Sequence, residues 1–403
     1  MSAWITVIGM GEDGMQGLSS HCISMIQKAE VIFAGERHHC KVQNTQAEVL
    51  DWGKGFNHAL KEIEARRGKN IVVLASGDPM NFGVGSVLVR VFGKEAVNVY
   101  PAPGSFSLAA SRMGWPIPEV DCLTIHGRPI ENLIKYFSPG ARLLILSHDG
   151  SSPEKVANLL NVKGYGKSKI SVLEHLGGVK EKRIDGRAVS WNYRCAQALN
   201  TLAVECVAEA DTVALSRVPG LPDEVFENDG QLTKSEVRAI TIAQLRPLPG
   251  QVLWDIGAGS GSISIEWLRL GGHRKAIAIE RDCKRISIMK LNAANLGTMD
   301  LVIIEGDYHC VKDDIPFSPD AIFIGGGASD ISLLRSAWKA LGPKGRIVIN
   351  AVSIEAEQSL LALREEIGGQ LSCISIKRAT PIGTFSALKP MLSVTQFVGI
   401  KPS

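Results

Sequence analysis

The chain has 403 residues, of which 45% are hydrophobic and 21% charged, with a formal net charge of +3. One hydrophobic core rarely spans this length, so two domains of about 200 residues each are expected. The absence of a long apolar run argues against a membrane protein, and the interspersed charges argue against a nucleic-acid-binding stripe. We therefore expect a cytoplasmic protein with neither a membrane nor a nucleic acid as its partner.

The first half alternates apolar runs of strand length with helical patterns. This alternation predicts an α/β domain with strands at 4–8, 31–34, 71–75, 97–100, 143–147, 170–173 and 202–206. Three of these strands are followed by loops rich in turn residues, at 9–14, 76–83 and 101–107. Because such loops gather at one sheet edge, we expect them to form a binding cleft.

Adjacent histidines and a cysteine, His38, His39 and Cys40, could suggest a metal site. Adjacent side chains on one loop seldom reach the same ion without a remote ligand, so no metal is predicted. The eight cysteines include no C-x-x-C pair, and we expect them to be reduced thiols used mostly in packing. Residues 180–183 alternate in charge and predict an exposed turn.

A break in the pattern falls between the halves, where Pro219, Gly220 and Pro222 can continue neither helix nor ladder. We place the boundary near 210–217, which gives domains at 1–212 and 218–403. Thr233 and Glu236 have the spacing of a capping box and predict a helix from there through Gln244.

The second half repeats strand and helix with the regularity of a doubly wound sheet. Strands are predicted at 252–256, 276–280, 301–305, 321–324 and 346–350. The glycine-rich turn at 257–261 joins the first of these to a helix expected over 262–270. Such a turn lets a ligand approach the backbone, and the helix start offers free N–H groups.

Two nucleotide-type ligands suit this turn, a dinucleotide and S-adenosylmethionine. Glu280 ends the next strand, where its carboxylate can accept hydrogen bonds from ribose hydroxyls in either case. The dinucleotide fingerprint needs a third glycine where this chain has Ser262, and Asp255 suits a cationic amino-acid ligand. The pattern favours S-adenosylmethionine, with a dinucleotide site or a purely structural turn as alternatives.

Several segments resemble known families. Residues 5–11, 75–83, 101–116 and 126–128 resemble the tetrapyrrole methylase fold, which implies two α/β subdomains. Residues 220–226, 233–238 and 325–327, together with the turn at 341–346, resemble the class I (Rossmann-like) methyltransferases that act in corrin synthesis. The resemblance covers nearly the whole chain. One departure is the first loop, Gly-Met-Gly-Glu-Asp-Gly, where many tetrapyrrole methylases have G-x-G-P-G; it leaves the contacts of Glu12 and Asp13 open.

The fused order implies a bifunctional, decarboxylating methyltransferase of cobalamin biosynthesis. The first domain would methylate carbon 5 of a metal-free corrin precursor, and the second would methylate carbon 15 and remove carbon dioxide from an acetate arm. Methyl transfer is an in-line displacement by a ring carbon, so no serine or cysteine nucleophile is needed. The macrocycle itself can act as the electron sink for decarboxylation, so no pyridoxal or thiamine motif is needed. The alternatives are the same reactions on a cobalt-containing ring, an RNA or protein methyltransferase, and a regulatory protein that binds cofactor without turnover.

The resemblance also implies one S-adenosylmethionine in each domain. The first would be surrounded by Gly9, Asp78, Phe82, Gly83, Ser105 and the strand end at His126. The second would be surrounded by Thr233, Gly257, Ala258, Gly259, Ser260, Gly261, Glu280 and Asp307, with Tyr308 beside the adenine.

The polycarboxylate tetrapyrrole substrate needs cationic and N–H donors. Arg37, His38 and Arg128 are candidates in the first domain, and Gly326, Gly327 and Ser329 form a candidate loop in the second. That loop can equally be a tight turn with Ser329 or Asp330 as N-cap. Arg378 and Lys389 could also meet carboxylates. Candidate catalytic residues are Asp307, His309 and Arg378, and we expect a homo-oligomer.

Overall fold

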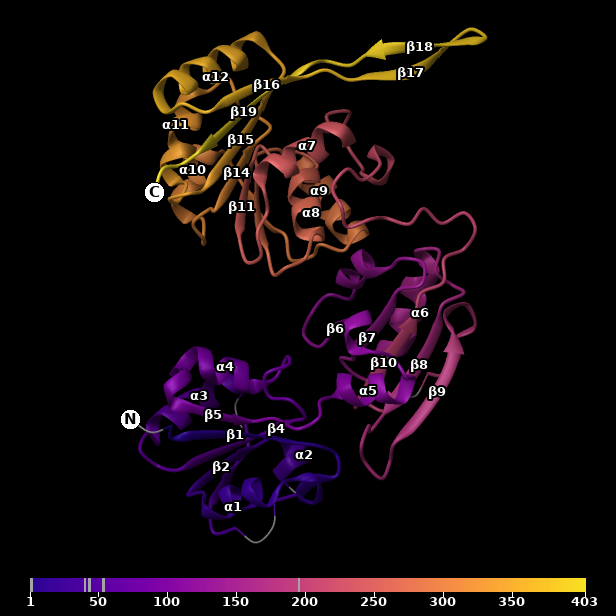
Figure 1. Cartoon of the computed structure of the whole chain (residues 1–403), viewed down its shortest axis with the longest axis vertical. Coiled ribbons are helices and arrows are strands. Elements are labelled where there is room, and N and C mark those ends of the chain that lie inside the picture. The colour runs from indigo at the N-terminus through magenta and orange to yellow at the C-terminus, as the bar shows by residue number, and fades with distance from the viewer. Residues whose placement is uncertain (1–2, 40, 43–44, 53–54, 195) are drawn as a thin grey trace. The chain divides into compact units, whose positions relative to one another are not determined.

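The computed structural model describes residues 3–39, 41–42, 45–52, 55–194 and 196–403. These form two compact units (Figure 1). The first comprises the described residues up to Ile130 and Ser138–Thr212, and the second comprises Glu131–Phe137 and Val213–Ser403. The short segment 131–137 thus groups with the second unit, a detail that a single boundary near 210–217 does not include.

The first unit begins with a parallel five-stranded sheet in the order β3-β2-β4-β1-β5. Its strands are nearly continuous apolar runs, as expected for a parallel sheet covered on both faces. Residues of α3 and α4 pack on one face and residues of α1 on the other. The elements are β1 (Ile5–Met10), α1 (Ser20–Lys28), β2 (Val31–Ala34), α2 (Glu36–His39), β3 (Glu48–Leu50), α3 (Phe56–Ala65), β4 (Ile71–Ser76), α4 (Val84–Phe92) and β5 (Val97–Tyr100).

A second five-stranded sheet, β6-β7-β10-β8-β9, completes this unit. Only β6 and β7 run parallel, and the other pairs are antiparallel. The expected two α/β subdomains are therefore present. The elements are α5 (Ser105–Met113), β6 (Asp121–Thr124), β7 (Arg142–Leu146), α6 (Ser152–Val162), β8 (Lys169–Glu174), β9 (Lys182–Arg187) and β10 (Asn200–Glu205).

The second unit contains a seven-stranded sheet in the order β13-β12-β11-β14-β15-β19-β16. Its first five strands are parallel, and β19 pairs antiparallel with both β15 and β16. Alternate strand residues face opposite layers: Leu253 packs with α7, α8 and α9, whereas Trp254 packs with α10, α11 and α12. The doubly wound class I methyltransferase fold expected from the sequence is confirmed.

The elements of this unit follow the predicted order. They are α7 (Ser235–Leu245), β11 (Val252–Ile256), α8 (Ser262–Arg269), β12 (Lys275–Glu280), α9 (Cys283–Leu296), β13 (Val302–Glu305), α10 (Tyr308–Val311), β14 (Ala321–Ile324), α11 (Ile331–Ala340), β15 (Arg346–Ala351), α12 (Ile354–Ile367), β16 (Gln370–Ile374), β17 (Lys377–Ile382), β18 (Phe385–Pro390) and β19 (Val394–Ile400). Figure 1 shows β17 and β18 as a hairpin that projects from this sheet.

Short 3₁₀ helices fill several connections. They are Gly14–Gly17, Lys94–Ala96, Ile117–Glu119, Ile130–Tyr136, Ala188–Ser190, Asp223–Val225 and Lys312–Asp314. In the described part of the chain, no helix has the length and hydropathy needed to cross a membrane.

Some sequence-based expectations were wrong. Seven strands were missed, β3, β6, β9 and β16 to β19, because most are short or carry polar and charged residues that break an apolar run. Residues 180–183 are not one turn, since Lys182 and Arg183 begin β9. The capping box is also absent: the N-cap of α7 is Lys234, and Glu236 bonds Arg378 instead.

Candidate functional sites

The glycine-rich turn of the second unit folds back onto the neighbouring strand. The backbone N–H groups of Gly257 and Ala258 both donate to the carbonyl of Ile279, at 2.9 and 3.1 Å. Gly257, Gly259 and Gly261 have φ of +68°, +57° and +80°, a region that residues with a Cβ rarely adopt. The glycines are therefore required by the turn itself.

These three glycines face different surroundings. A Cβ on Gly257 would lie 2.8 Å from the Cα of Gly326, so the two glycine-rich loops touch. A Cβ on Gly261 would lie 2.4 Å from Cγ of Met289, so that glycine permits helix packing. A Cβ on Gly259 would meet nothing within 4 Å. Gly259 alone of the three therefore exposes its backbone to open space that a ligand can occupy.

Glu280 lies against this turn. Its Oε2 accepts a hydrogen bond from the N–H of Gly259 at 2.8 Å, and its Oε1 accepts from the N–H groups of Arg281 and Asp282 at 2.9 and 3.0 Å. The side chain is 6% exposed. The carboxylate thus holds the open part of the turn at the end of β12.

Two further buried groups support the turn. Asp255 accepts from the N–H and hydroxyl of Ser264, and burial raises its pKa to about 6 despite these bonds, with a smaller contribution from Glu280. The amide of Asn292 donates to the carbonyl of Ser260 at 3.0 Å and to that of Glu227 at 2.9 Å. Asn292 was missed from the sequence because a lone asparagine inside a helix carries no local signal.

The residues after β13 divide into different roles. Asp307 is the N-cap of α10, accepting from the N–H of His309 at 3.0 Å. Tyr308, expected beside an adenine, is 3% exposed and packs on Trp254 in the core. His309 is exposed, and its Nε2 lies 3.0 Å from Oδ2 of Asp330.

Asp330 also caps α11, accepting from the N–H groups of Ser332 and Leu333. The N-cap alternative for this loop is therefore confirmed at Asp330, while Gly326 still faces Gly257. The carbonyl of Ser329 accepts a hydrogen bond from Ser359 at 2.9 Å. Gly327 has φ of +84°. Capping of the helix and an accessible loop backbone coexist here.

Arg378, a candidate partner of substrate carboxylates, has several partners within the protein. Its guanidinium already bonds Glu236 and Asp223, and Lys389 lies opposite it in the hairpin. Thr233 directs its carbonyl to Arg238, a fully buried side chain.

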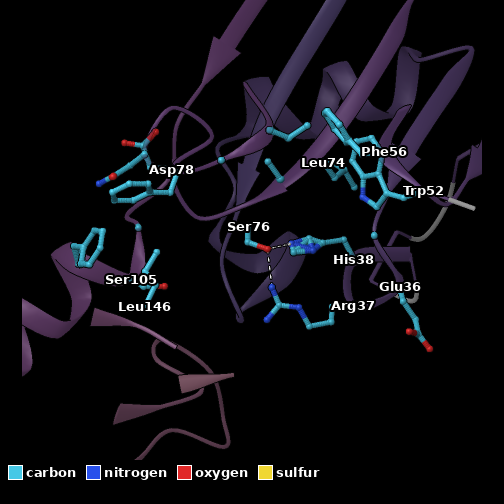
Figure 2. Close-up of a pocket in the computed structure, with 18 residues that line it drawn as sticks. Glu36, Arg37, His38, Trp52, Phe56, Leu74, Ser76, Asp78, Ser105 and Leu146 are labelled. Atoms are coloured by element: carbon cyan, nitrogen blue, oxygen red, sulfur yellow. Dashed lines mark hydrogen bonds between the residues drawn. The ribbon is translucent and has the colours of Figure 1, made fainter. Parts of the chain in front are cut away.

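In the first unit, the loops after β2, β4 and β5 line a cavity of about 480 Å³ (Figure 2). The cavity brings together many of the residues expected at the first cofactor and substrate sites: Arg37, His38, Asp78, Phe82, Gly83 and Ser105. Ser76 and Phe106 also line it, within the loops 76–83 and 101–107 expected to form a cleft, whereas Trp52 and Phe56 line it and were missed. Trp52 and Phe56 follow the short strand β3, whose absence from the prediction left that loop unassigned.

In Figure 2, dashed lines join Ser76 to both Arg37 and His38. The Ser76 hydroxyl accepts from Arg37 at 2.6 Å and lies 3.4 Å from Nε2 of His38. His38 is 4% exposed, and burial lowers its pKa to about 4, with further lowering by Arg37 and Lys41 and a small opposing effect of Glu12. His38 is therefore a neutral imidazole at neutral pH.

Gly9 and Gly83 serve close packing. A Cβ on Gly9 would lie 2.0 Å from the carbonyl oxygen of Gly77, and one on Gly83 would lie 2.6 Å from that of Pro79. Gly9 therefore allows the loops to converge and presents no open surface at its Cα. Oδ1 of Asp78 accepts from the N–H of Met80 at 2.8 Å, which shapes the loop between them.

The wall of the cavity continues through aromatic contacts. Phe82 is 47% exposed, has φ of +54°, and packs edge-on against Phe106. Arg128 lies 5.3 Å from the Phe82 ring centroid. His126 is outside the set of lining residues and instead packs on His148, with ring centroids 5.4 Å apart. Arg128 and His126 are thus both outside the set of lining residues, but Arg128 contacts Phe82, which belongs to it.

Glu12 lies in the first loop, where the sequence differs from the G-x-G-P-G pattern. It bonds Lys41 and His175, each at about 3 Å. Burial opposes ionisation of Glu12, but these hydrogen bonds outweigh it and its pKa is lowered. Asp13 packs against Gly11 and Gly17. Cys40 of the possible metal cluster lies outside the described residues, and no metal-binding group of His, Cys, Asp or Glu occurs within the described ranges.

Comparison with known proteins defines the class of the chain. Residues 5–189 match the family of Tetrapyrrole (Corrin/Porphyrin) Methylases, and residues 224–401 match the Precorrin methyltransferase domain. The chain is thus a methyltransferase built from two methylase domains. Members of this class use S-adenosylmethionine.

Full-length relatives identify the family. The precorrin-6Y C(5,15)-methyltransferase [decarboxylating] of Sinorhizobium sp is 41% identical over 398 residues, covering 98% of this chain and 96% of the relative. The protein of the same name from Mycobacterium tuberculosis (strain CDC 1551 / Oshkosh) is 37% identical over 98% of both chains. The chain belongs to the precorrin-6Y C(5,15)-methyltransferase (decarboxylating) family, which confirms the resemblance seen in the sequence.

A shorter relative is also informative. The probable cobalt-precorrin-6B C(15)-methyltransferase (decarboxylating) of Saccharolobus solfataricus is 35% identical over 156 residues, covering 38% of this chain and 78% of the relative. On the basis of its full-length relatives, the chain is a methyltransferase of cobalamin biosynthesis that also decarboxylates.

Proposed function

We propose that the two units divide the reactions on metal-free precorrin-6Y, with carbon 5 methylated in the first and carbon 15 methylated, with loss of carbon dioxide, in the second. The observation that carries this division is the presence of two candidate sites of different construction, the cavity at Ser76 and the open turn at Gly259. The name of the shorter relative supports it, because carbon 15 methylation and decarboxylation occur together there in a protein that matches only part of this chain.

We also propose one S-adenosylmethionine per unit. The residues fit this group: the turn leaves Gly259 open, the carboxylate of Glu280 ends the adjacent strand, and the first unit offers a cavity with both aromatic and polar walls. When bound, the cofactor supplies an electrophilic methyl group. The protein's contribution is then orientation and exclusion of water.

The chain's own groups suit a polyanionic ring. In the first unit, Arg37 and the neutral His38 provide donors at one wall of the cavity. In the second, the loop at Gly326 and Gly327 leads into α11, whose start favours negative charge. When the acetate arm loses carbon dioxide, its bonding electrons pass into the conjugated ring, and a proton later completes the new methyl group.

The overall reaction is tested by incubating the chain with precorrin-6Y and methyl-labelled S-adenosylmethionine, followed by mass spectrometry. We expect two labelled methyl groups and loss of one carbon dioxide. An unchanged ring mass would contradict the metal-free assignment, and turnover of only the cobalt-containing ring would favour that alternative.

We further propose a homo-oligomer formed through the β17–β18 hairpin. Ile382, Phe385 and Leu388 on this hairpin are 62%, 80% and 66% exposed. A two-stranded hairpin is marginally stable by itself in water, and its open edges are self-complementary for pairing with a second copy.

Phe385→Asp should reduce the molecular mass in solution, because a charge at the centre of an apolar contact opposes association. Leu361→Asp, at an exposed apolar position on α12, is the control and should leave the mass unchanged. Light scattering coupled to size-exclusion chromatography measures both. A monomeric wild type, or an unchanged mass in Phe385→Asp, would contradict the hairpin interface.

A further inference from the structure

The base of the β17–β18 hairpin is tied to the start of α7 by Arg378. Its Nε donates to Oε1 of Glu236 at 3.0 Å, and its Nη2 donates to Oε2 of Glu236 at 2.5 Å. Nη2 also lies 3.1 Å from Oδ2 of Asp223 and 3.2 Å from the hydroxyl of Ser235. Arg378 thus connects the hairpin to two separate places in the segment 220–236.

Asp223 is shared with a second arginine. Its Oδ1 accepts from Nη1 of Arg238 at 3.1 Å, while its Oδ2 faces Arg378. Arg238 is fully buried and also donates to the carbonyls of Leu221 and Thr233. The two arginines therefore bond different oxygens of the same Asp223 carboxylate, and both attach the segment 220–236 to the rest of the unit.

The same segment is attached to both sides of the cofactor turn. On one side, Glu266 of α8 accepts from Nε of Arg238 at 2.8 Å and from the N–H of Gly220 at 2.7 Å. On the other side, Asn292 of α9 joins Glu227 to the carbonyl of Ser260, inside the turn. Hydrogen bonds and the backbone of the segment 220–236 therefore connect Arg378 to Ser260, the neighbour of Gly259.

We call the bonded group of Arg378, Glu236, Asp223 and Arg238 the clamp. Its stability depends on the bonds that connect the exposed Arg378–Glu236 pair to buried groups. Arg378 and Glu236 are 40% and 42% exposed, and an isolated pair at such a place contributes only about 0.2–1 kcal/mol. Here the hydrogen bonds from Arg378 lower the pKa of Glu236 to about 2, and Glu236 in turn raises the pKa of Arg378. The link to the buried Arg238–Glu266 pair adds bonds whose loss would leave buried charges poorly compensated.

We propose that Arg378 is a positioning residue for the cofactor site of the second unit, holding the segment 220–236, and with it Thr233, in the arrangement that receives S-adenosylmethionine. This inference rests on the proposed function, which assigns decarboxylation and one cofactor to this unit. It replaces direct pairing of Arg378 with substrate, because its Nε and Nη2 donors are already used by Glu236, Asp223 and Ser235. Arg378 would also link the cofactor turn to the hairpin, which we propose to be the contact with a second copy.

The test compares Arg378→Gln with Arg335→Gln in the full-length chain. Arg335 makes a bidentate pair with Glu366 between α11 and α12, at 51% and 38% exposure, and lies outside the clamp. Release of carbon dioxide reports on the second unit, and its rate as a function of S-adenosylmethionine concentration gives KM. Hydrogen exchange of peptides covering 220–238 measures the segment without any turnover.

For Arg378→Gln we expect a roughly tenfold rise in KM for S-adenosylmethionine and a roughly tenfold faster exchange over 220–238, because about 1.4 kcal/mol of local stability is lost. Arg335→Gln should change neither. Arg378→Lys should be intermediate, because an ammonium can keep the Glu236 pair but cannot reproduce the planar fork.

Unchanged KM and unchanged exchange in Arg378→Gln would overturn the inference. So would a rise in KM for the tetrapyrrole alone, which is the result expected of a substrate-binding arginine. A lower kcat with unchanged KM would also overturn it, as the sign of a partly unfolded population. If the wild type releases no carbon dioxide, the proposed function fails, whereas the exchange measurement still decides whether the clamp exists.

Discussion

The two candidate sites differ in which part of the chain forms them. In the first unit, side chains make the site. Trp52, Phe56 and Phe82 line the cavity, whereas Gly9 packs closely against the backbone of neighbouring loops. In the second unit, the backbone makes the site, because the turn leaves space open at Gly259, whose N–H donates to the carboxylate of Glu280. Two sites expected to bind the same cofactor are thus built differently, one mainly from side chains and the other mainly from backbone.

Their buried titratable groups differ as well. Burial lowers the pKa of His38 in the first site and raises the pKa of Asp255 in the second, so both groups are pushed toward their neutral forms. The second site should therefore be sensitive to any added side chain, and the first to the identity of particular side chains.

The largest effect is expected for Gly259→Arg. An arginine here would project into the open space over the turn and would also require φ near +57°. We expect loss of decarboxylation and of one methyl transfer by at least about a hundredfold, with the methylation at the first unit retained. The measurement is the mass of the product formed with labelled S-adenosylmethionine.

The matched control is Gly271→Arg, in the same unit. Gly271 also has a positive φ, +73°, and a Cβ there would meet nothing within 4 Å, but it lies in the turn between α8 and β12. Equal losses in both variants would mean that strain alone, and not occupation of the cofactor turn, explains the result.

The next effect concerns His38→Gln and acid stability. Because the folded chain keeps His38 neutral to about pH 4 while the unfolded chain protonates it near pH 6.5, the wild type loses stability as the pH falls through this window. The contribution is on the order of 3 kcal/mol, since each pH unit between these two pKa values corresponds to about 1.4 kcal/mol. The variant should lose less stability over the same range, measured by urea unfolding.

His58→Gln, at an exposed position on α3, is the control for loss of an imidazole. Parallel pH profiles for wild type and His38→Gln would show that burial of this histidine does not affect its protonation, and would weaken the contrast between the sites.

The smallest effect is expected for Asp78→Ala. The change removes a cavity-lining carboxylate and the bond to the N–H of Met80. We expect methylation at the first unit to fall about tenfold, equivalent to about 1.4 kcal/mol, while decarboxylation continues. Asp149→Ala removes a similar bond, to the N–H of Ser151 at 2.8 Å, away from the cavity, and is the control. Loss of decarboxylation in Asp78→Ala would indicate that the units do not act separately.

Much of the fold was predictable because its signals are local. The strands β2, β5, β11 and β14 begin and end where the apolar runs do, since each is a short buried run bounded by turn residues. The hairpin was not predictable, because most of its residues are exposed and it buries little that a pattern could report. The capping box was misread because Glu236 finds a stronger partner, Arg378, 142 residues away.

The sequence by itself determined the two-domain α/β organisation, the loops at the strand ends and the family, because strand periodicity and glycine-rich turns depend on residues that are close together in the sequence. Only the tertiary structure decided which glycine is open, that Tyr308 is core, and that Arg378 holds a protein segment. The physical reason is that each of these outcomes depends on contacts between residues far apart in the chain, where local propensity carries no information.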